Sequence, residues 1–165
     1  MTRDDFDELA DSWRAAGIAP SVVSHLELSK RIMRLSGILE QALKVELAEL
    51  GLTYAEFDVL AALYRSGQLK PGELSRALLL TSGGASNVVQ RLQAAGYVER
   101  VADPDDKRSH WVRLTEAGTT LMDQAMDISI RLHEDVFSRA PDAAVNQAVD
   151  ALRDILVALG PRRMR

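Results

Sequence analysis

The sequence predicts a mainly α-helical protein that carries one small β-hairpin. Aromatic residues make up only 5% of the 165 residues, while hydrophobic residues as a whole reach 47%. The core is therefore mostly leucine, valine, isoleucine and alanine, a composition that favours helices. Over most of the chain, apolar positions recur every three or four residues, as on one face of a helix. Only residues 97–102 and 110–114 alternate with a period of two, which is typical of strands.

The first fifty residues predict two helices. A short helix over residues 5–16 ends at Gly17 and Pro20. A long amphipathic helix follows, with apolar positions at Leu26, Leu28, Ile32, Leu35, Leu39, Leu43 and Leu47 and with Gly51 just past its end. It would span roughly 27 residues, or ~40 Å at about 1.5 Å per residue. We expect a helix of this length to pack against a second chain or along a bundle.

Three shorter helices are predicted in the middle of the chain. Thr53 and Glu56 have the spacing of a capping box. Pro71 suits the first position of a short helix through residue 78. Thr81 and Ser82 are placed to cap the next helix. That helix closes at Gly96, and its inward positions are Ala85, Val88, Val89 and Leu92.

The remaining elements are two strands and two helices. The strands cover residues 97–102 and 110–114 and flank a charged loop; we call residues 97–114 the wing. Thr115 caps a long helix, which Pro141 interrupts, and a last helix runs over residues 142–159. Leu121, Met122 and Met126 are expected in an interface core.

A helix, a tight turn, a second helix and a hairpin together predict a winged helix-turn-helix. The predicted organisation is an N-terminal arm (1–20), a helical dimerisation region (21–50 and 116–160), a winged helix-turn-helix lobe (51–115) and a basic tail (161–165). A helix ~10–12 Å wide fits the major groove of DNA, which is about 12 Å wide. We therefore expect the second helix of the pair to contact double-stranded DNA.

The outer face of this helix is polar, with Ser82, Gly83, Gly84, Ser86, Asn87, Gln90 and, at its flank, Arg91. Gly83 and Gly84 allow backbone amides to approach a phosphate. Asn87 and Gln90 have the amide geometry that pairs with adenine edges, and Arg91 suits guanine or phosphate. The plainer interpretation is a solvated face of an amphipathic helix.

The tip of the wing carries a second set of candidate DNA contacts. Arg108 suits insertion into a narrow minor groove, Asp106 is placed to hold its guanidinium, and Lys107 lies beside it. The alternative is a charged turn that protects an exposed sheet edge. The charge distribution agrees with DNA contact, because residues 70–114 carry a net +2 although the whole chain carries −4.

The sequence gives no support to several other classes of protein. The chain has no cysteine, which excludes a disulfide scaffold and a catalytic thiol. Its three histidines have no metal-ligand spacing, no phosphate-binding loop or nucleophile elbow is present, and no cofactor is expected. An acidic start and the lack of an apolar run of about 18 residues predict a cytoplasmic protein without a membrane span.

Three stretches of the sequence resemble the MarR family of regulators. They are residues 91–100 (RLQAAGYVER), 103–108 (DPDDKR) and 112–118 (VRLTEAG), and the likeness extends upstream through residues 51–53 and 56–60. The resemblance implies a homodimer with intertwined terminal helices, a palindromic operator and repression relieved by a small ligand. It makes Arg108 the minor-groove residue, Asp106 its anchor, and Ser86, Asn87 and Gln90 the major-groove readers. The family often has a basic residue where this chain has Asn87.

The N-terminal arm adds a finer resemblance. Trp13, Asp58 and Arg65 are similar to residues of the urate-responsive branch of that family, which implies a small organic-anion or aromatic ligand. The branch also uses an arginine of the recognition helix, where this chain has Val88, with Arg91 one turn on. The alternative is that Trp13 packs the arm onto the core and Arg65 pairs with a carboxylate.

The sequence therefore predicts a homodimeric DNA-binding repressor without enzymatic activity. Two other functions are kept as alternatives. One is a winged-helix module that binds protein, and the other is a small-molecule hydrolase with the pocket as its active site. The second lacks a nucleophile and base pair in the sequence.

Overall fold

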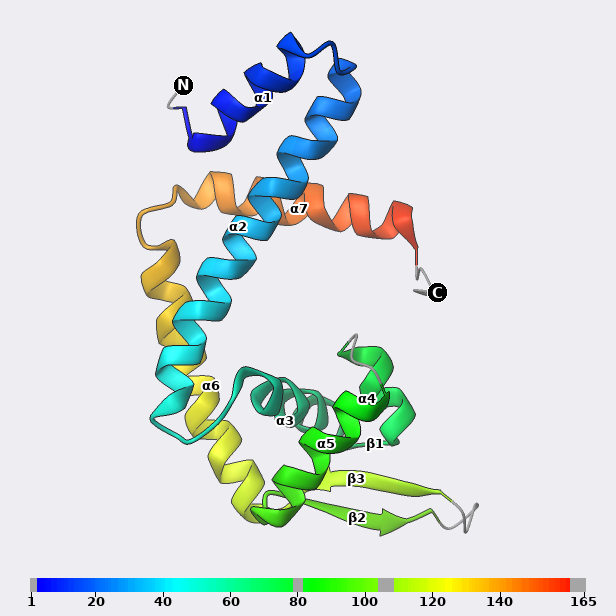
Figure 1. The fold of residues 1–165 in the computed structure, drawn as a ribbon. Helices are drawn as coiled ribbons and strands as arrows, with labels where there is room; N and C mark the ends of the chain where they lie inside the picture. The colour runs from blue at the N-terminus through cyan, green and yellow to red at the C-terminus, as the bar shows by residue number, and fades with distance from the viewer. Residues whose placement is uncertain (1–2, 79–81, 104–108, 161–165) are drawn as a thin grey trace. The chain divides into compact units, whose positions relative to one another are not determined.

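The computed structural model describes residues 3–78, 82–103 and 109–160, without the side chain of Ser82. Its helices and short strands follow the order predicted for a mainly α-helical winged helix-turn-helix protein (Figure 1). The turn 79–81 with the Thr81 cap, the wing tip with Asp106, Lys107 and Arg108, and the basic tail 161–165 lie outside the described residues. The chain divides into two compact units, Met1–Leu132 and His133–Arg165.

The N-terminal arm is a helix that folds back on the first half of a long helix (Figure 1). These helices are α1 (Asp5–Ala15) and α2 (Pro20–Ala48). The Asp4 carboxylate accepts a hydrogen bond from the Phe6 amide in a capping box. Arg31 of α2 pairs with Asp4 at 2.9 Å and with Asp7 at 3.1 Å. These ion pairs and the buried Ala10 and Val23 join α1 to α2.

The winged helix-turn-helix lobe contains α3 (Tyr54–Ser66), α4 (Pro71–Ala77) and α5 (Ser82–Ala94). The capping box predicted at the start of α3 is confirmed: the Glu56 amide donates to Thr53 Oγ1 at 3.2 Å, and the Thr53 amide donates to Glu56 Oε2 at 2.8 Å. The prediction of Pro71 at the first position of α4 is also confirmed. Gly96, with φ of 79°, follows α5 in the left-handed conformation that favours glycine.

The sheet has one strand more than predicted. β1 (Gln68–Leu69), β2 (Val98–Ala102) and β3 (His110–Leu114) form an antiparallel sheet in the order β1-β3-β2. The prediction of a two-stranded hairpin was therefore incomplete. A strand of two residues is too short to show any alternation in the sequence. β1 pairs with the inner part of β3 only. The outer end of β3 pairs with β2 and leads to the wing loop.

The core of the lobe lies between α3, α4, α5 and the sheet. Its most deeply buried side chains include Leu60, Leu63, Leu74, Val89, Leu92 and Val112. The four positions predicted to face inward on α5, Ala85, Val88, Val89 and Leu92, are all buried. This packing holds one face of α5 inside the lobe and turns the opposite face to solvent.

Two further helices complete the fold, α6 (Glu116–Phe137) and α7 (Asp142–Leu159). Leu121 and Met122 are buried within the chain's own core, so the prediction that they face a partner is wrong, while Met126 is 36% exposed. Periodicity shows that these residues share a buried face but not which surface covers it. Among the described residues, none of the helices is long and apolar enough to span a bilayer.

Candidate nucleic-acid interface

The outer face of α5 presents the predicted polar side chains to solvent. Gly83, Asn87 and Gln90 are exposed, and Gly84 and Ser86 are half-buried. Because the opposite face is packed into the core, these positions are fixed by the interior of the lobe. The exposed amides of Asn87 and Gln90 are therefore held on a rigid element.

Arg91 continues this face, but it has a partner that the sequence did not indicate. Its Nε lies 3.2 Å from Oε1 of Glu56 in the first turn of α3. The Glu56 side chain is 13% exposed and also accepts from the Thr53 amide. One carboxylate therefore caps α3 and orients the guanidinium beside α5. Glu56 and Arg91 are 35 positions apart, and no local pattern links them.

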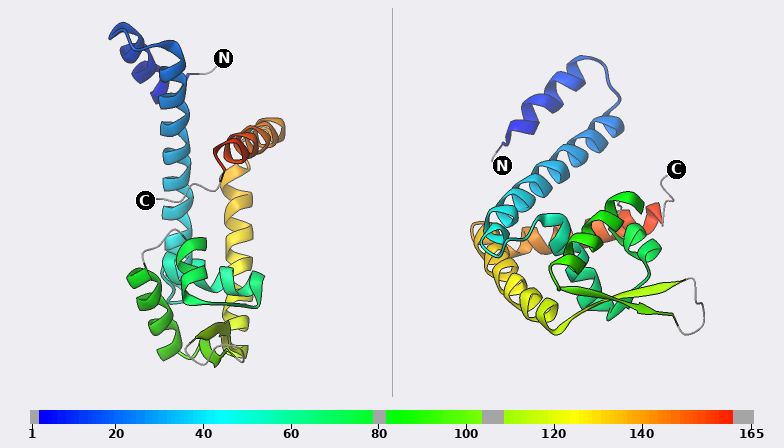
Figure 2. Two further views of the ribbon diagram at one scale, coloured as in Figure 1. Left: turned by 90° about the vertical axis from the view of Figure 1, so that its right-hand side faces the viewer. Right: turned by 60° about the horizontal axis from the view of Figure 1, so that its bottom comes forward.

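The wing projects from the lobe as an antiparallel hairpin (Figure 2). Its strands pair from Val98 with Leu114 to Ala102 with His110. Glu99 and Arg113 face each other across the hairpin and form an ion pair at 2.6 Å. The hairpin therefore has a continuous ladder up to the point where its loop begins.

Asp103 closes this ladder and is buried, with 5% of its surface exposed. Its carboxylate lies 2.6 Å from Nζ of Lys70, which stands just before α4. The same Nζ lies 4.8 Å from the ring centre of Trp111 on β3. Sequence reasoning missed this cluster, because it treated Asp103 as one of several charges in an exposed loop.

A close joint connects the end of α5, the start of the wing and α6. Thr115 Oγ1 donates to the Gly96 carbonyl at 2.7 Å and accepts from the Gly118 amide at 3.1 Å. The Thr115 amide donates to the Tyr97 carbonyl at 3.1 Å. A Cβ atom at Gly118 would lie 1.9 Å from that carbonyl oxygen. The threonine and glycine of the LTEAG stretch thus fix where α6 begins relative to α5.

Two of the predicted ligand residues, Asp58 and Arg65, share helix α3. Asp58 is half-buried, and burial raises the pKa of its carboxyl, with Glu40 adding to the rise and Arg65 opposing it. Arg65 is exposed, and no carboxylate among the described residues lies within ion-pair distance of it. The alternative that Arg65 pairs with a carboxylate is therefore not seen in the described part of the chain.

Trp13 lies apart from these two residues within one chain. It is half-buried on α1, where the neighbouring Arg14 pairs with Glu27 of α2 at 3.2 Å. Glu40, whose charge acts on Asp58, is thirteen residues further along α2 than Glu27. At about 1.5 Å per residue this separation is roughly 20 Å. The structure therefore brings Asp58 and Arg65 together on one helix but does not bring Trp13 to them.

A family model described as the MarR family matches residues 50–109, which include α3 to β2 and the wing loop up to the start of β3. The chain is also 31% identical over 112 residues to the HTH-type transcriptional repressor NicR from Pseudomonas putida, and the match covers 68% of each chain. The protein belongs to the MarR family. It is 35% identical over 95 residues to the regulator YkoM from Bacillus subtilis, a match that covers 57% of this chain and 62% of YkoM.

Solved MarR structures share the fold. The apo form of wild-type MarR from Escherichia coli superposes with a TM-score of 0.71 at 27% identity, over 78% of this chain and 96% of that one. A mutant E. coli MarR in complex with operator DNA gives a TM-score of 0.74 at 24% identity, over 93% of this chain and 99% of that one. These relatives are transcription regulators and not enzymes. The matched part of this chain spans less than two thirds of the length of several curated relatives. It spans 59% of MarR from E. coli.

Proposed function

We propose that this MarR-family protein is a cytoplasmic repressor that binds a palindromic operator in double-stranded DNA as a homodimer. The observation that carries the proposal is the structure of α5. Its inner face is locked into the core, and its outer face presents Asn87 and Gln90 on a rigid surface. We infer that this face enters the major groove, where a carboxamide can pair with the edge of adenine through two hydrogen bonds.

The start of α5 would contact the DNA backbone. A Cβ atom added at Gly83 would meet no atom of the described residues within 4 Å, apart from its chain neighbours and its own helix backbone. The N-terminal turn of a helix favours a negative charge, and in α5 this turn begins with Ser82, Gly83 and Gly84. A phosphate at this end would set the depth at which α5 enters the groove. Arg91, oriented by Glu56, would add a contact at the other flank.

The wing would add a minor-groove contact. We infer that Arg108 enters the groove, that Asp106 orients it and that Lys107 binds a neighbouring phosphate. The net charge of +2 over residues 70–114, on a chain of net −4, supports this arrangement. Phosphate contacts release counterions, so the affinity should fall as salt rises.

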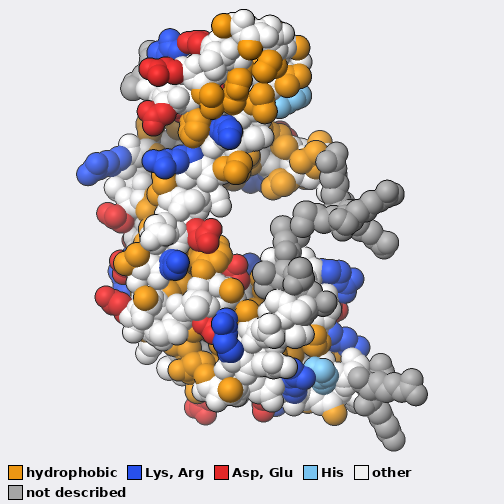
Figure 3. All heavy atoms as spheres, viewed as in Figure 1, with side chains coloured by type: hydrophobic (Ala, Val, Ile, Leu, Met, Phe, Trp, Pro, Cys, Tyr) orange, Lys and Arg blue, Asp and Glu red, His pale blue; other side chains and the backbone are white. Residues whose placement is uncertain are grey.

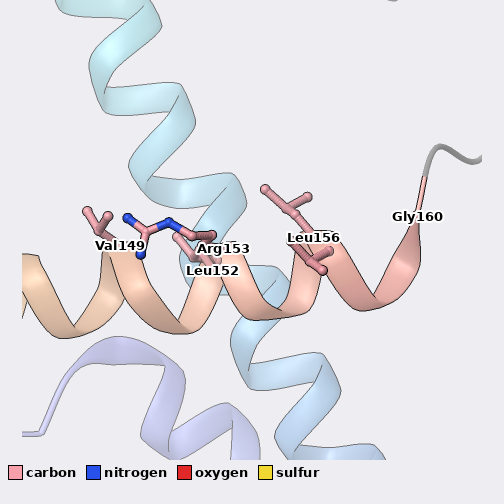
Figure 4. A pocket seen from close by; sticks show the side chains of 6 residues that line it. Val149, Leu152, Arg153, Leu156 and Gly160 are labelled. Carbon is pink, nitrogen blue, oxygen red and sulfur yellow. The ribbon is translucent and has the colours of Figure 1, made fainter.

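Exposed apolar side chains support the homodimer. On α2 they include Val22, Ile32, Met33, Ile38 and Val45, and Figure 3 shows apolar side chains at the surface of the N-terminal helices. On α7, which has no buried residue, Leu156 is 67% and Val157 75% exposed. Val149, Leu152 and Leu156 line an open hollow of about 700 Å³ along that helix (Figure 4). Helices as apolar as these are covered by a partner in soluble proteins.

Ligand control would act on the spacing of the two recognition helices. A dimer must place them about one turn of DNA apart, ~34 Å. We infer that a small organic anion binds near Asp58 and Arg65 and favours a spacing that does not match the operator. Trp13 would join this site only from the second chain of the dimer, because it lies roughly 20 Å from Asp58 along α2 in its own chain. That the protein represses transcription, as proposed above, is supported by its relative NicR, which is a repressor.

The experiment that tests the proposal is a titration of labelled DNA from upstream of the protein's own gene, with scrambled DNA as the control. Tight binding to the upstream DNA alone, weakening as salt rises, is expected. Organic anions are then added to the complex, and release that is lost in Arg65→Ala supports the anion site. If the folded protein binds neither the upstream DNA nor the scrambled DNA, but binds a protein partner through the wing, the alternative function as a protein-binding winged-helix module is favoured instead.

A further inference from the structure

Asp103 is the single charged residue in the described ranges with less than a tenth of its surface exposed. Removing a carboxylate from water is costly unless a partner charge and hydrogen bonds replace the water. The residue stands where β2 ends and the wing loop begins. Asp103 is not part of the hydrophobic core of the lobe, so the burial of its charge needs another explanation.

Lys70 supplies the partner charge from a fixed position. Its Nζ lies 2.6 Å from Asp103 Oδ2. Its amide donates to Glu73 Oε2 at 2.8 Å, and its carbonyl accepts from the amides of Glu73 and Leu74. The backbone of Lys70 is thus held by the first turn of α4. The ion pair therefore joins the wing to the first helix of the helix-turn-helix.

Trp111 covers the ion pair from the outer face of the sheet. Lys70 Nζ lies over its ring at 4.8 Å from the centre, within the range of a cation–π contact. On the other side of the loop, the Asp103 amide donates to the Ser109 carbonyl at 3.3 Å. The two ends of the wing loop are thus closed on each other and fastened to α4.

We propose that Lys70, Asp103 and Trp111 are positioning residues that set the direction of the wing relative to α5. The proposal rests on the proposed function, because it concerns how the wing reaches DNA while α5 lies in the major groove. The three residues fasten the outer end of the hairpin ladder to α4, and α4 packs against α5. A wing released from this anchor would lose its contacts with DNA while the contacts of α5 remain.

A direct role for Lys70 on a DNA phosphate is the competing explanation, since 36% of its side chain is exposed. Asp103→Asn separates the two roles. It takes the negative partner charge away from Lys70 and lowers the negative charge near the DNA, so a direct role predicts unchanged or tighter binding. A positioning role predicts weaker binding, of about five- to tenfold, because the anchor is lost while every basic residue remains.

Glu99→Gln is the matched control. It removes one negative charge from β2, the strand that Asp103 follows, and it does so from an ion pair with Arg113 that is half exposed. Exposed pairs contribute little to stability, so this variant should bind operator as tightly as the natural protein or slightly tighter. A loss equal to that of Asp103→Asn would show that charge alone matters and would overturn the proposal.

The decisive measurement repeats both substitutions in an Arg108→Ala background. If Asp103 acts through the wing, Asp103→Asn should cost less than about twofold once Arg108 is absent. If its full effect persists there, the proposal is wrong. Trp111→Leu keeps the charges of Lys70 and Asp103 and should weaken operator binding as Asp103→Asn does. It replaces Asp103→Asn in this test if circular dichroism shows that Asp103→Asn is unfolded. Failure of the natural protein to bind any upstream DNA would instead overturn the proposed function, and this inference with it.

Discussion

At the residue scale, Gly118 is the position where a single added methyl group should do most harm. A Cβ atom there would overlap the Tyr97 carbonyl oxygen at 1.9 Å, and the neighbouring Cα and carbonyl carbon leave no room to move aside. We expect Gly118→Ala to lower the free energy of unfolding by about 1–3 kcal/mol, the usual cost of overpacking. Urea unfolding at a fixed protomer concentration measures the effect.

Gly72→Ala is the control for this substitution. Gly72 also lies in a helix, α4, but apart from its chain neighbours and its own helix backbone no atom in the described part of the chain lies within 4 Å of its Cβ position. Since alanine has the higher helix propensity, Gly72→Ala should leave the stability unchanged or raise it slightly. Equal stability of Gly118→Ala and Gly72→Ala would contradict the close contact between α6 and Tyr97 at the start of the wing.

Asp58 should make the stability depend on pH. Burial raises the pKa of this carboxyl in the folded protein, so the folded chain keeps the proton to a higher pH than the unfolded chain does. The stability that protonation gives is fully present below the ordinary carboxyl pKa of about 4 and is lost as pH rises through the folded pKa. Asp58→Asn, which stays neutral, should therefore gain stability relative to the natural protein as pH rises from about 3 to neutrality.

Urea unfolding of both proteins across this range tests the sign. A difference in unfolding free energy that does not change with pH would contradict it. Arg65→Gln provides a second check: because Arg65 opposes the rise in the pKa of Asp58, removing its charge should steepen the pH dependence of stability in the chain that keeps Asp58.

At the scale of elements, the sequence predicts helices well where a local signal marks their ends. The Thr53–Glu56 capping box, Pro71 at the first position of α4 and Gly96 after α5 each act within one turn, and each was confirmed. β1 was missed because two residues carry no period. It exists only because Gln68 and Leu69 pair with β3, more than forty positions further along the chain.

Helix α5 allows a test of base reading with two glutamines. Gln90 and Gln93 are both exposed on α5, but Gln90 lies opposite the buried stripe while Gln93 lies at its flank in the last turn. We expect Gln90→Ala to weaken operator binding by about 1–3 kcal/mol and to relax the preference at one base pair. Gln93→Ala should leave both unchanged. Fluorescence anisotropy on operator variants measures them, and a loss of similar size in both variants would contradict the assigned face.

At the scale of the whole molecule, the contacts that assemble the site were beyond sequence reasoning. Periodicity predicted which residues of α5 face outward, because that depends on one helix alone. The pairs Glu56 with Arg91 and Lys70 with Asp103 join residues 35 and 33 positions apart, and only the folded chain brings them together. For the same reason, Leu121 and Met122 could be predicted as apolar but not assigned to the chain's own core.

The homodimer makes a prediction about α7. Leu156 and Val157 are apolar and largely exposed in the single chain. A glutamate at either position would place a charge in a covered interface, which is costly without a partner. We expect Leu156→Glu to shift the protein toward monomers in sedimentation experiments, while Gln147→Glu, on an exposed polar position of the same helix, leaves the dimer intact. A Leu156→Glu dimer as stable as the natural one would remove α7 from the interface.

The proposed function requires that two α5 helices of one dimer read double-stranded DNA, and hydroxyl-radical footprinting of the upstream DNA measures this. We expect two protected half-sites related by a dyad, with centres about one helical turn, ~34 Å, or a multiple of it apart. Protection of both should fade together as salt rises. A folded dimer that protects no upstream sequence, or that protects one isolated site without a symmetric partner, would contradict it.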